Sequence, residues 1–160
     1  RLNILKEHGL GLNDIQEVIA EMGPFPGAKE FVEWLRTHFQ LIILSDTFYE
    51  FAHPLMKQLG WPTIFCHKLE TDEKGMITAY KLRQPDQKRE AVKGLHGLNY
   101  RVIAAGDSYN DTTMLGEADK GFLFDAPENV IKEFPQFPAI HGYEALKEAI
   151  RNASVRDIPA

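Results

Sequence analysis

The sequence has little of what several common classes of protein require. Cys66 is the only cysteine among 160 residues, so the chain has neither an intrachain disulfide nor a set of thiolates for a zinc site. Lysine and arginine number 18 against 23 aspartates and glutamates, which leaves a net charge of -5. Such a chain lacks the basic surface that displaces counterions from nucleic acid. The sequence therefore favours a small-molecule partner and a reducing compartment.

Long apolar runs are absent as well. No stretch approaches the roughly 20 apolar residues that a membrane span needs, so we expect no membrane segment. The composition is 44% hydrophobic and 26% charged, which is typical of one soluble globular domain with a core. The first residue is Arg1, already inside a helical pattern, so we expect the natural protein to begin upstream.

The apolar periodicity predicts helices that alternate with short buried strands. Helices are expected at residues 13–22, 28–35, 48–59, 86–95 and 143–153, with a short one after Pro127. Strands are expected at residues 40–44, 63–66, 100–105 and 121–124, with a hairpin within 68–82. This alternation is typical of a parallel α/β sheet that helices cover on both faces. The run GPFPG predicts a boundary that separates residues 1–26 from residues 27–160.

Polar side chains follow two of the expected strands. Ser45, Asp46 and Thr47 come directly after residues 40–44, and the run GDSYND comes after residues 100–105. Because parallel strands present their carboxyl ends at one edge of a sheet, we expect a ligand site there. A hydroxyl with free amides can bind phosphate oxygens, and a carboxylate can hold a hard cation such as Mg²⁺. Taken alone, each cluster is equally typical of a turn or a helix cap.

The order of these motifs resembles a known family. Ser45, Lys88 and the run GDSYND at 106–111 resemble motifs two, three and four of the haloacid-dehalogenase-like phosphatases. Longer blocks resemble the phosphoserine phosphatase branch that also acts as a phosphoserine:homoserine phosphotransferase. These blocks are LSDTFYEF, PLMKQLG, CHKLE, LRQPDQKR, RVIAAGDSYNDTTML and APENVIKEFPQFP. The resemblance implies a Rossmann-like parallel sheet within 27–160 and makes residues 1–26 part of a helical cap.

Five of the residues that the resemblance singles out would contact substrate. The hydroxyl of Ser45 would bind phosphate oxygens, helped by the backbone around Asp46 and Thr47. Asn110 would contact the phosphate or the substrate. Arg1 aligns with the cap arginine that grips the substrate carboxylate, a suitable task for a bidentate guanidinium. Ordinary phosphoserine phosphatases have small glycines after the motif-two serine, so Asp46 and Thr47 predict a reshaped substrate pocket.

The resemblance gives the remaining three residues catalytic and metal-binding roles. Lys88 would neutralise the phosphoryl group and steady the nucleophilic carboxylate. Asp107 would ligate Mg²⁺, and Asp111 would support either the metal or Lys88. These roles suit the chemistry, because enzymes catalyse phosphoryl transfer mainly by positioning groups and stabilising charge.

The nucleophile of the family is missing from the chain. It is the first aspartate of an Asp-x-Asp motif, whose second aspartate acts as general acid and base, and no such motif occurs in the 160 residues. We expect it upstream, on a central first strand absent from this chain, between the strands at 41–44 and 102–105. Those two strands should then lie roughly 10 Å apart. The 160-residue chain by itself is expected to be inactive.

The resemblance implies a function for the complete protein. It would hydrolyse O-phosphoserine, or pass the phosphoryl group to homoserine, through an aspartyl-phosphate with Mg²⁺ in cytoplasmic serine metabolism. Two alternatives remain open: a phosphatase of another small phosphomonoester, and a phosphate-binding relative that has lost its nucleophile. We interpret His53, His67 and His141 as packing or hairpin residues, and Cys66 as a small buried hydrophobe.

Overall fold

The computed structural model describes residues 8–159. The chain forms two compact units, Arg1–Pro85 and Asp86–Ala160. The division between these units therefore follows Pro85. The boundary expected after residue 26, between a cap segment and an α/β core, stays a prediction.

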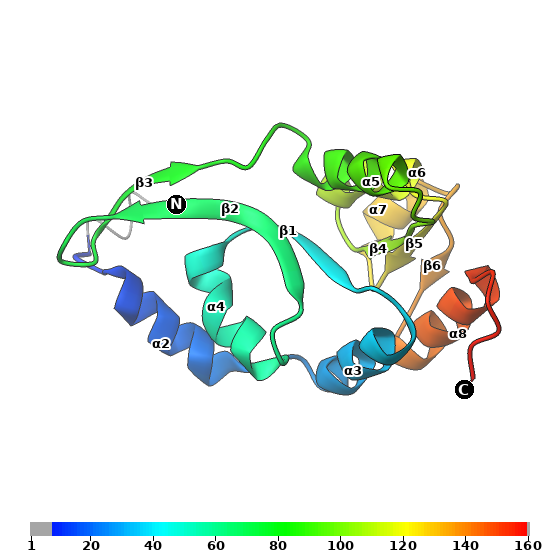
Figure 1. Ribbon diagram of the computed structural model, residues 1–160, viewed down its shortest axis with the longest axis horizontal. Coiled ribbons are helices and arrows are strands. Elements are labelled where there is room, and N and C mark those ends of the chain that lie inside the picture. The colour runs from blue at the N-terminus through cyan, green and yellow to red at the C-terminus, as the bar shows by residue number, and fades with distance from the viewer. Residues whose placement is uncertain (1–7, 160) are drawn as a thin grey trace. The chain divides into compact units, whose positions relative to one another are not determined.

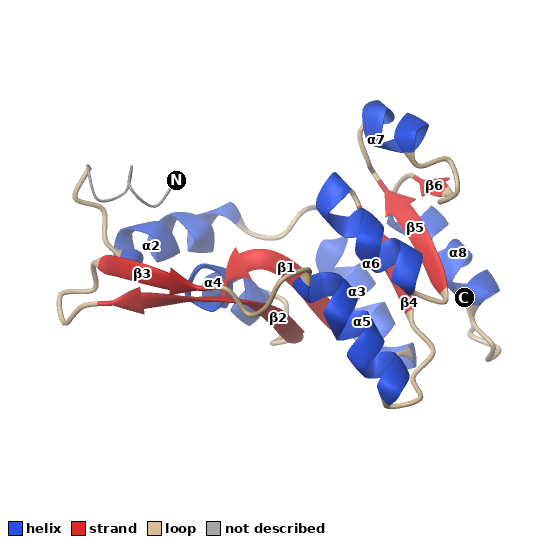
Figure 2. Ribbon diagram, turned by 90° about the horizontal axis from the view of Figure 1, so that it is seen from above, coloured by secondary structure: helices blue, strands red, loops and turns tan. Residues whose placement is uncertain are grey.

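The first unit contains three helices and a three-stranded sheet among its described residues (Figure 1). The helices are α2 (Leu12–Met22), α3 (Ala28–His38) and α4 (Tyr49–Gln58). The strands are β1 (Ile42–Phe48), β2 (Thr63–Thr71) and β3 (Ile77–Lys81). Strand β2 pairs with both of the others, parallel to β1 and antiparallel to β3, and Figure 2 shows the opposite directions of β2 and β3.

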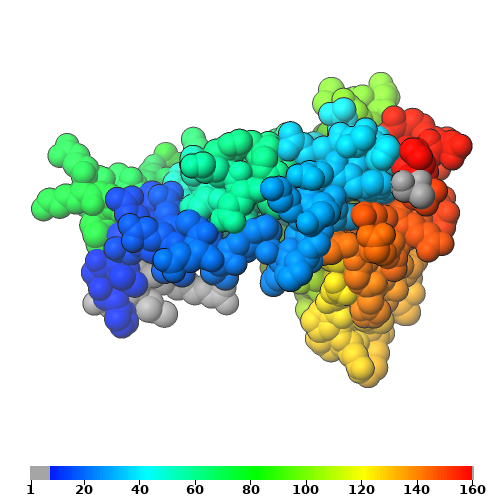
Figure 3. Space-filling model, turned by 90° about the horizontal axis from the view of Figure 1, so that it is seen from below, coloured from blue at the N-terminus to red at the C-terminus, as the bar shows by residue number. Residues whose placement is uncertain are grey.

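Helix α2 begins at Leu12, one residue earlier than expected. Its N-cap is Gly11, and the Asp14 carboxylate turns back to accept the backbone N–H of Gly11 at 2.7 Å. The helix packs against α4, where the Gln16 side chain donates to the Glu50 carbonyl at 2.7 Å. Figure 3 shows α2, in dark blue, on the surface of this unit.

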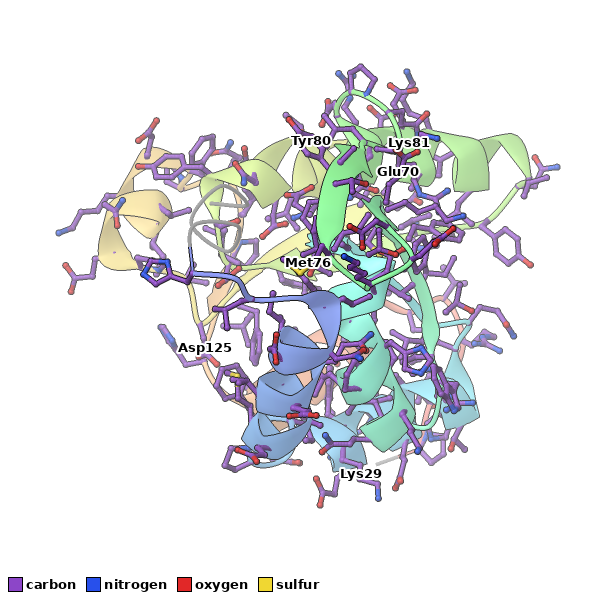
Figure 4. The ribbon with its side chains drawn as sticks, turned by 90° about the vertical axis from the view of Figure 1, so that its left-hand side faces the viewer. Lys29, Glu70, Met76, Tyr80, Lys81 and Asp125 are labelled. Carbon is purple, nitrogen blue, oxygen red and sulfur yellow. The ribbon has the colours of Figure 1, made fainter. Side chains whose placement is uncertain are left out.

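Strand β2 is a single strand of nine residues, where the sequence predicted a short strand at 63–66 and a separate hairpin arm. Its first part pairs with β1 and its second part with β3, so one strand serves both partners. The hairpin expected within 68–82 is confirmed. Its tip is held by the Asp72 carboxylate, which accepts the backbone N–H groups of Lys74 and Met76 at 2.9 Å. Glu70 and Lys81 pair across the two arms (Figure 4).

The core of the first unit lies between its sheet and its helices. Four buried residues form it, and four partly buried residues pack against them: Val32, Ala52, Met56 and Leu59, then Leu41, Ile43, Leu55 and Ile64. Pro54 lies inside α4 without ending it. The expectation that residues 40–44 are buried on both faces is wrong, because Leu41 to Leu44 remain partly exposed. Within the described residues β1 has a strand neighbour on one side only, and this limits its burial.

The second unit contains a parallel sheet with the strand order β4-β5-β6. Its strands are β4 (Ile103–Gly106), β5 (Lys120–Phe124) and β6 (Ala139–Ile140), the last of which the sequence analysis missed. Its helices are α5 (Gln87–Gly97), α6 (Thr112–Glu117), α7 (Glu128–Glu133) and α8 (Tyr143–Ala153), with a 3-10 turn at Tyr109–Asp111. The most deeply buried side chains of this unit are Val92, Leu115, Leu123, Val130 and Leu146.

Strands β1 and β4 belong to different sheets, so they are not hydrogen-bonded neighbours. Their expected separation of roughly 10 Å stays a prediction. Residues 8–159 contain no helix with the length and hydropathy that crossing a bilayer requires.

Gly121 in β5 offers a direct test of packing in the second unit. A Cβ atom there would lie 2.6 Å from the Leu115 carbonyl oxygen and 2.9 Å from the Leu115 Cβ. Gly121→Ala should therefore lower the free energy of unfolding by roughly 1–3 kcal/mol, measured by urea denaturation. The matched control is Gly116→Ala, because a Cβ atom at residue 116 would lie 3.9 Å from the Phe137 Cζ, an ordinary van der Waals contact. The control should leave the free energy of unfolding unchanged or raise it by up to about 1 kcal/mol. Equal effects of the two substitutions would show that Leu115 does not restrict residue 121.

Candidate active site

A buried ion pair lies at the centre of the candidate site in the second unit. Lys88 is near the start of α5, and Asp111 ends the 3-10 turn that precedes α6. The Lys88 Nζ donates to Asp111 Oδ1 at 2.8 Å, and the two residues are only 8% and 6% exposed. Burying one of these charges alone would be strongly unfavourable, so each stabilises the other in place. The sequence predicted that Asp111 would support Lys88 or a metal; the structure shows the hydrogen bond to Lys88, and the role in catalysis stays a prediction.

The second oxygen of Asp111 organises the motif loop. Oδ2 accepts the backbone N–H groups of Asp107 and Ser108 at 3.0 and 3.1 Å, and the Ser108 hydroxyl donates to it at 3.0 Å. One carboxylate therefore holds Lys88 on one side and the loop after β4 on the other. The last aspartate of the run GDSYND thus fixes the shape of the loop and its distance from Lys88.

The pKa of the Asp111 carboxyl lies below its ordinary value. Burial by itself would raise this pKa, because a low dielectric disfavours the ionised form. The hydrogen bond and the charge of Lys88, together with the hydrogen bonds from Ser108, outweigh burial and lower it. Asp111 is therefore ionised at neutral pH.

Asp107 is the residue that the sequence assigned to Mg²⁺. It follows β4 directly and is exposed, and its carboxylate makes no hydrogen bond or ion pair to any described residue. Mg²⁺ is commonly held by one or two carboxylates together with waters and substrate phosphates, so an outward carboxylate at a strand end fits it. Residues 8–159 contain no cluster of three histidines, cysteines, aspartates or glutamates that could hold a metal alone. Asp107 could therefore supply one ligand, with further ligands from elsewhere.

The motif-two residues lie inside β1, so the expectation that this strand ends at Leu44 is wrong. Leu44 pairs with Phe65 and Phe48 pairs with His67, which sets three residues of β1 against one residue of β2. The three are Ser45, Asp46 and Thr47, and they form a bulge in which the Ser45 hydroxyl accepts the Thr47 N–H at 3.3 Å. Such bulges redirect side chains at the edges of functional sites.

The structure places the eight predicted site residues in three groups. Lys88, Asp107, Asn110 and Asp111 belong to the second unit, where Asn110 is exposed in the 3-10 turn. The motif-two residues Ser45 to Thr47 belong to the first unit. Arg1 lies outside the described residues. That Ser45, Lys88 and Asp107 meet in one crevice stays a prediction.

Comparison with known proteins decides the family. The sequence profile of the haloacid dehalogenase-like hydrolases matches residues 3–119 of this chain. The chain belongs to this family. It is 64% identical over 158 residues to phosphoserine phosphatase ThrH of Pseudomonas aeruginosa, a match that covers 99% of this chain and 77% of the relative. A phosphoserine phosphatase of Pseudomonas syringae pv. tomato is 61% identical, with 99% of this chain and 67% of the relative covered.

Solved structures support the fold. A phosphoserine phosphatase determined as a phospho-aspartyl intermediate analogue matches with a TM-score of 0.71 at 20% identity. The match covers 89% of this chain and 70% of that one. The α/β fold predicted from the sequence is thereby confirmed as that of a haloacid dehalogenase-like hydrolase.

Tyr109 connects the family's motif loop to α7, a contact that the sequence analysis missed. Its hydroxyl donates to Glu133 at 2.7 Å and accepts from Asn129 at 3.2 Å, and its ring meets Phe134 edge-on at 5.8 Å. The hydrogen bond to Glu133 raises the pKa of the Tyr109 hydroxyl. The spacing of Asn129, Glu133 and Phe134 in the printed sequence carries no signal that would have identified them as partners of the loop.

Gly106 is the position where the family motif tolerates no side chain. A Cβ there would lie 2.5 Å from the Asp111 Cβ and 2.6 Å from its Cγ. Gly106→Ala should therefore displace Asp111, weaken its bond to Lys88 and lower the free energy of unfolding by roughly 1–3 kcal/mol. Urea denaturation measures the loss, with Gly94→Ala as the control, because no heavy atom lies within 4 Å of a Cβ at Gly94. A Gly106→Ala variant as stable as the Gly94→Ala variant would show that the loop can move aside.

Cys66 is buried in β2, as expected, with 1% of its surface exposed. Burial raises the pKa of its thiol to about 11, although the nearby Arg83 charge partly opposes this. Because the thiolate is the reactive form, Cys66 should resist iodoacetamide at pH 8 in the folded chain and react readily in urea. Mass spectrometry measures the fraction of Cys66 that is alkylated with and without urea. Rapid labelling without urea would show that β2 opens easily.

Proposed function

We propose that this chain is part of a Mg²⁺-dependent phosphoserine phosphatase. The observation that carries the proposal is the buried Lys88–Asp111 pair at the end of the motif-four loop. Two relatives above 60% identity are named phosphoserine phosphatases, which supports the same substrate. The family's Asp-x-Asp does not occur in these 160 residues, so the proposal concerns the protein that carries this motif together with the chain.

The reaction gives Lys88, Ser45 and Asp107 separate tasks. The nucleophilic carboxylate of the Asp-x-Asp forms a bond to phosphorus while the bond from phosphorus to the serine oxygen breaks, and that oxygen takes a proton. Water then attacks the aspartyl-phosphate, which releases phosphate and restores the carboxylate. Lys88 balances the charge of the phosphoryl group, and the Ser45 hydroxyl donates to a phosphate oxygen. Mg²⁺ bound at Asp107 would offset the remaining negative charge.

We extend the proposal to a second acceptor. In place of water, the hydroxyl oxygen of homoserine can attack the phosphorus of the same aspartyl-phosphate and give its proton to the second aspartate of the Asp-x-Asp, while the bond from phosphorus to the first aspartate breaks. The polar pair Asp46 and Thr47, where ordinary phosphoserine phosphatases have glycines, supports a pocket reshaped for such an acceptor. The single, buried cysteine favours a reducing compartment, so we place the reaction in the cytoplasm and in serine metabolism.

The experiment is a phosphate-release assay on the full-length protein. A panel of small phosphomonoesters is offered with and without Mg²⁺, and O-phosphoserine should give the highest kcat/KM and require the metal. Phosphorus NMR with added homoserine detects transfer, which should appear as O-phosphohomoserine at the expense of free phosphate. A higher kcat/KM for a different phosphomonoester would show that phosphoserine is the wrong substrate, although the protein would still be a phosphatase. A full-length protein without an Asp-x-Asp, or without any turnover, would favour the phosphate-binding alternative.

A further inference from the structure

Lys88 is the second residue of α5, so its position depends on how firmly the first turn of this helix is held. The first backbone N–H groups of a helix lack partners within it, and helix ends therefore open more easily than helix centres. The Lys88 side chain is buried and bonded to Asp111, so a shift of the helix start would disturb this pair. The contacts that fix the start of α5 therefore affect the placement of Lys88.

Asp86 is the N-cap residue of α5, and its side chain is bonded outside the helix. An aspartate at an N-cap ordinarily accepts a backbone N–H of the first helical turn. In α5 the Asp86 side chain makes no such capping bond. Its Oδ1 instead accepts the hydroxyl of Thr113 in α6 at 2.7 Å. The start of α5 is thus tied to a second helix by a contact between residues that are distant in sequence.

The backbone of Asp86 adopts a conformation that needs support. Its φ of 47° and ψ of 44° lie in the left-handed region, which a Cβ disfavours and which aspartate, asparagine and glycine tolerate best. Such conformations persist where neighbouring contacts hold them, and they are frequent at functional sites. The Asp86 carbonyl accepts the N–H of Glu90 at 3.0 Å, so one residue holds both the first turn of α5 and the contact with Thr113.

The contact between Asp86 and Thr113 lies next to the buried ion pair along both helices. Lys88 follows Asp86 by two residues, and Thr113 follows Asp111 by two residues. The same two chain segments are therefore joined twice, by an exposed hydrogen bond and by a buried ion pair. Because the segments are short and helical, the first contact restricts the distance across which the second one forms.

We propose that Asp86 and Thr113 are positioning residues, whose hydrogen bond holds the start of α5 where Lys88 can balance the charge of the phosphoryl group. This inference rests on the proposed function, because Lys88 takes part in the reaction only if the phosphoryl group binds beside it. The two residues act by placement, since a group that stabilises a transition state must be in position before the reaction begins. Loss of their contact should therefore reduce kcat more than it changes KM.

The test is the hydrolysis of O-phosphoserine by the full-length protein and by three variants of this contact. Thr113→Val removes the hydroxyl donor and keeps the shape of the side chain. Asp86→Gly permits the left-handed conformation and removes the acceptor. Each should lower kcat by roughly three- to tenfold, the equivalent of one hydrogen bond, and change KM by less than about twofold. Asp86→Asn keeps the left-handed conformation and an acceptor oxygen, so its kcat should stay within about twofold of the unmodified value.

Combined variants separate positioning of Lys88 from a general structural role. Asp86→Gly together with Thr113→Val should lose no more kcat than either change alone, because both remove the same hydrogen bond. Thr113→Val added to Lys88→Met should cause no further fall in kcat, because no charge is left to place. A further fall in that background would show that Thr113 acts independently of Lys88, and the proposed role would be wrong.

Arg89→Met is the matched control. The Arg89 Nε donates to Glu117 Oε2 at 2.8 Å, so this pair also joins α5 to α6, but it does so at the last residue of α6. Its side chains are 46% and 24% exposed, and solvent screens such a pair. The control should therefore keep kcat within about twofold. An equal loss in the Arg89 and Thr113 variants would show that any contact between the two helices has this effect.

The outcomes also separate this inference from the proposed function. An unchanged kcat in Thr113→Val, or a change in KM alone, overturns the positioning role and leaves phosphoserine as the substrate. If the unmodified protein hydrolyses a different phosphomonoester, the proposed substrate is wrong, and the same variants assayed with that phosphomonoester decide the positioning role. If the full-length protein hydrolyses no phosphomonoester, the proposed function and the positioning role are both wrong.

Discussion

Lys88→Met in the full-length protein should lower the kcat for O-phosphoserine by roughly a hundred- to thousandfold and also destabilise the fold. The catalytic loss follows because the charge that stabilises the phosphoryl group in the transition state is gone. The structural loss follows because Asp111, 6% exposed, keeps its hydrogen bonds to the motif loop but loses its cationic partner. Breaking a buried pair in this way costs about 3–5 kcal/mol at neutral pH.

The pH dependence of this loss has a defined sign. In the folded chain the pKa of Asp111 is lowered, so its contribution to stability is present above the ordinary carboxyl pKa of about 3.9 and disappears as the pH falls through the lowered value. Without Lys88, its hydrogen bond and its charge no longer lower that pKa, so we expect the pKa of Asp111 to rise. The variant can then neutralise Asp111 by binding a proton, so its deficit in the free energy of unfolding should be smaller at pH 5 than at pH 7. Urea denaturation at the two pH values measures the difference.

Lys93→Met is the matched control for this change. Lys93 lies on the same helix, and its Nζ pairs with Glu90 at 2.8 Å, but both side chains are exposed. Solvent screens such pairs, so the control should keep its activity and nearly all of its stability at both pH values. Similar losses in the Lys88 and Lys93 variants would show that the buried pair has no special role.

Asp107→Asn should raise the Mg²⁺ concentration needed for half-maximal activity by at least tenfold and lower the maximal rate. An amide lacks the charge of the carboxylate, and Asp107 is the described residue that we propose contacts the metal. A Mg²⁺ titration of phosphoserine hydrolysis by the full-length protein measures both quantities. Because the Asp107 carboxylate contacts no described residue, the variant should unfold at the same urea concentration as the unmodified protein.

Asp125→Asn is the control for the metal prediction. Asp125 also follows a strand of the same sheet directly, but its carboxylate accepts the Gly142 N–H at 3.2 Å and lies 3.3 Å from His141. Its removal should therefore leave the Mg²⁺ titration unchanged. Equal shifts in the two variants would contradict the assignment of the metal to Asp107.

Local patterns in the sequence were enough to predict several elements. The last helix was expected at residues 143–153 and is found at Tyr143–Ala153, because its apolar face repeats with helical spacing and Gly142 precedes it. The hairpin was predicted from charged turn residues between two alternating runs, and Asp72 indeed holds the tip. Both elements depend on residues within a few positions of one another.

Elements whose limits depend on a distant partner were predicted less well. β1 continues through Ser45, Asp46 and Thr47 because β2 offers Phe65 and His67 on either side of the bulge. Polar residues after an apolar run normally indicate a loop, so no local rule would have extended the strand. β6 was missed for a related reason, since its two residues form a strand only by pairing with β5.

The sequence by itself determined the family, the order of its motifs and the residue types of the site, because these depend on identity and spacing along the chain. Only the tertiary structure decided that Asp111 holds both Lys88 and the loop after β4, and that His67 faces Asp46. The physical reason is that a carboxylate or an imidazole can bind any suitable partner within about 3–4 Å, and folding selects that partner from residues that are far away in the sequence.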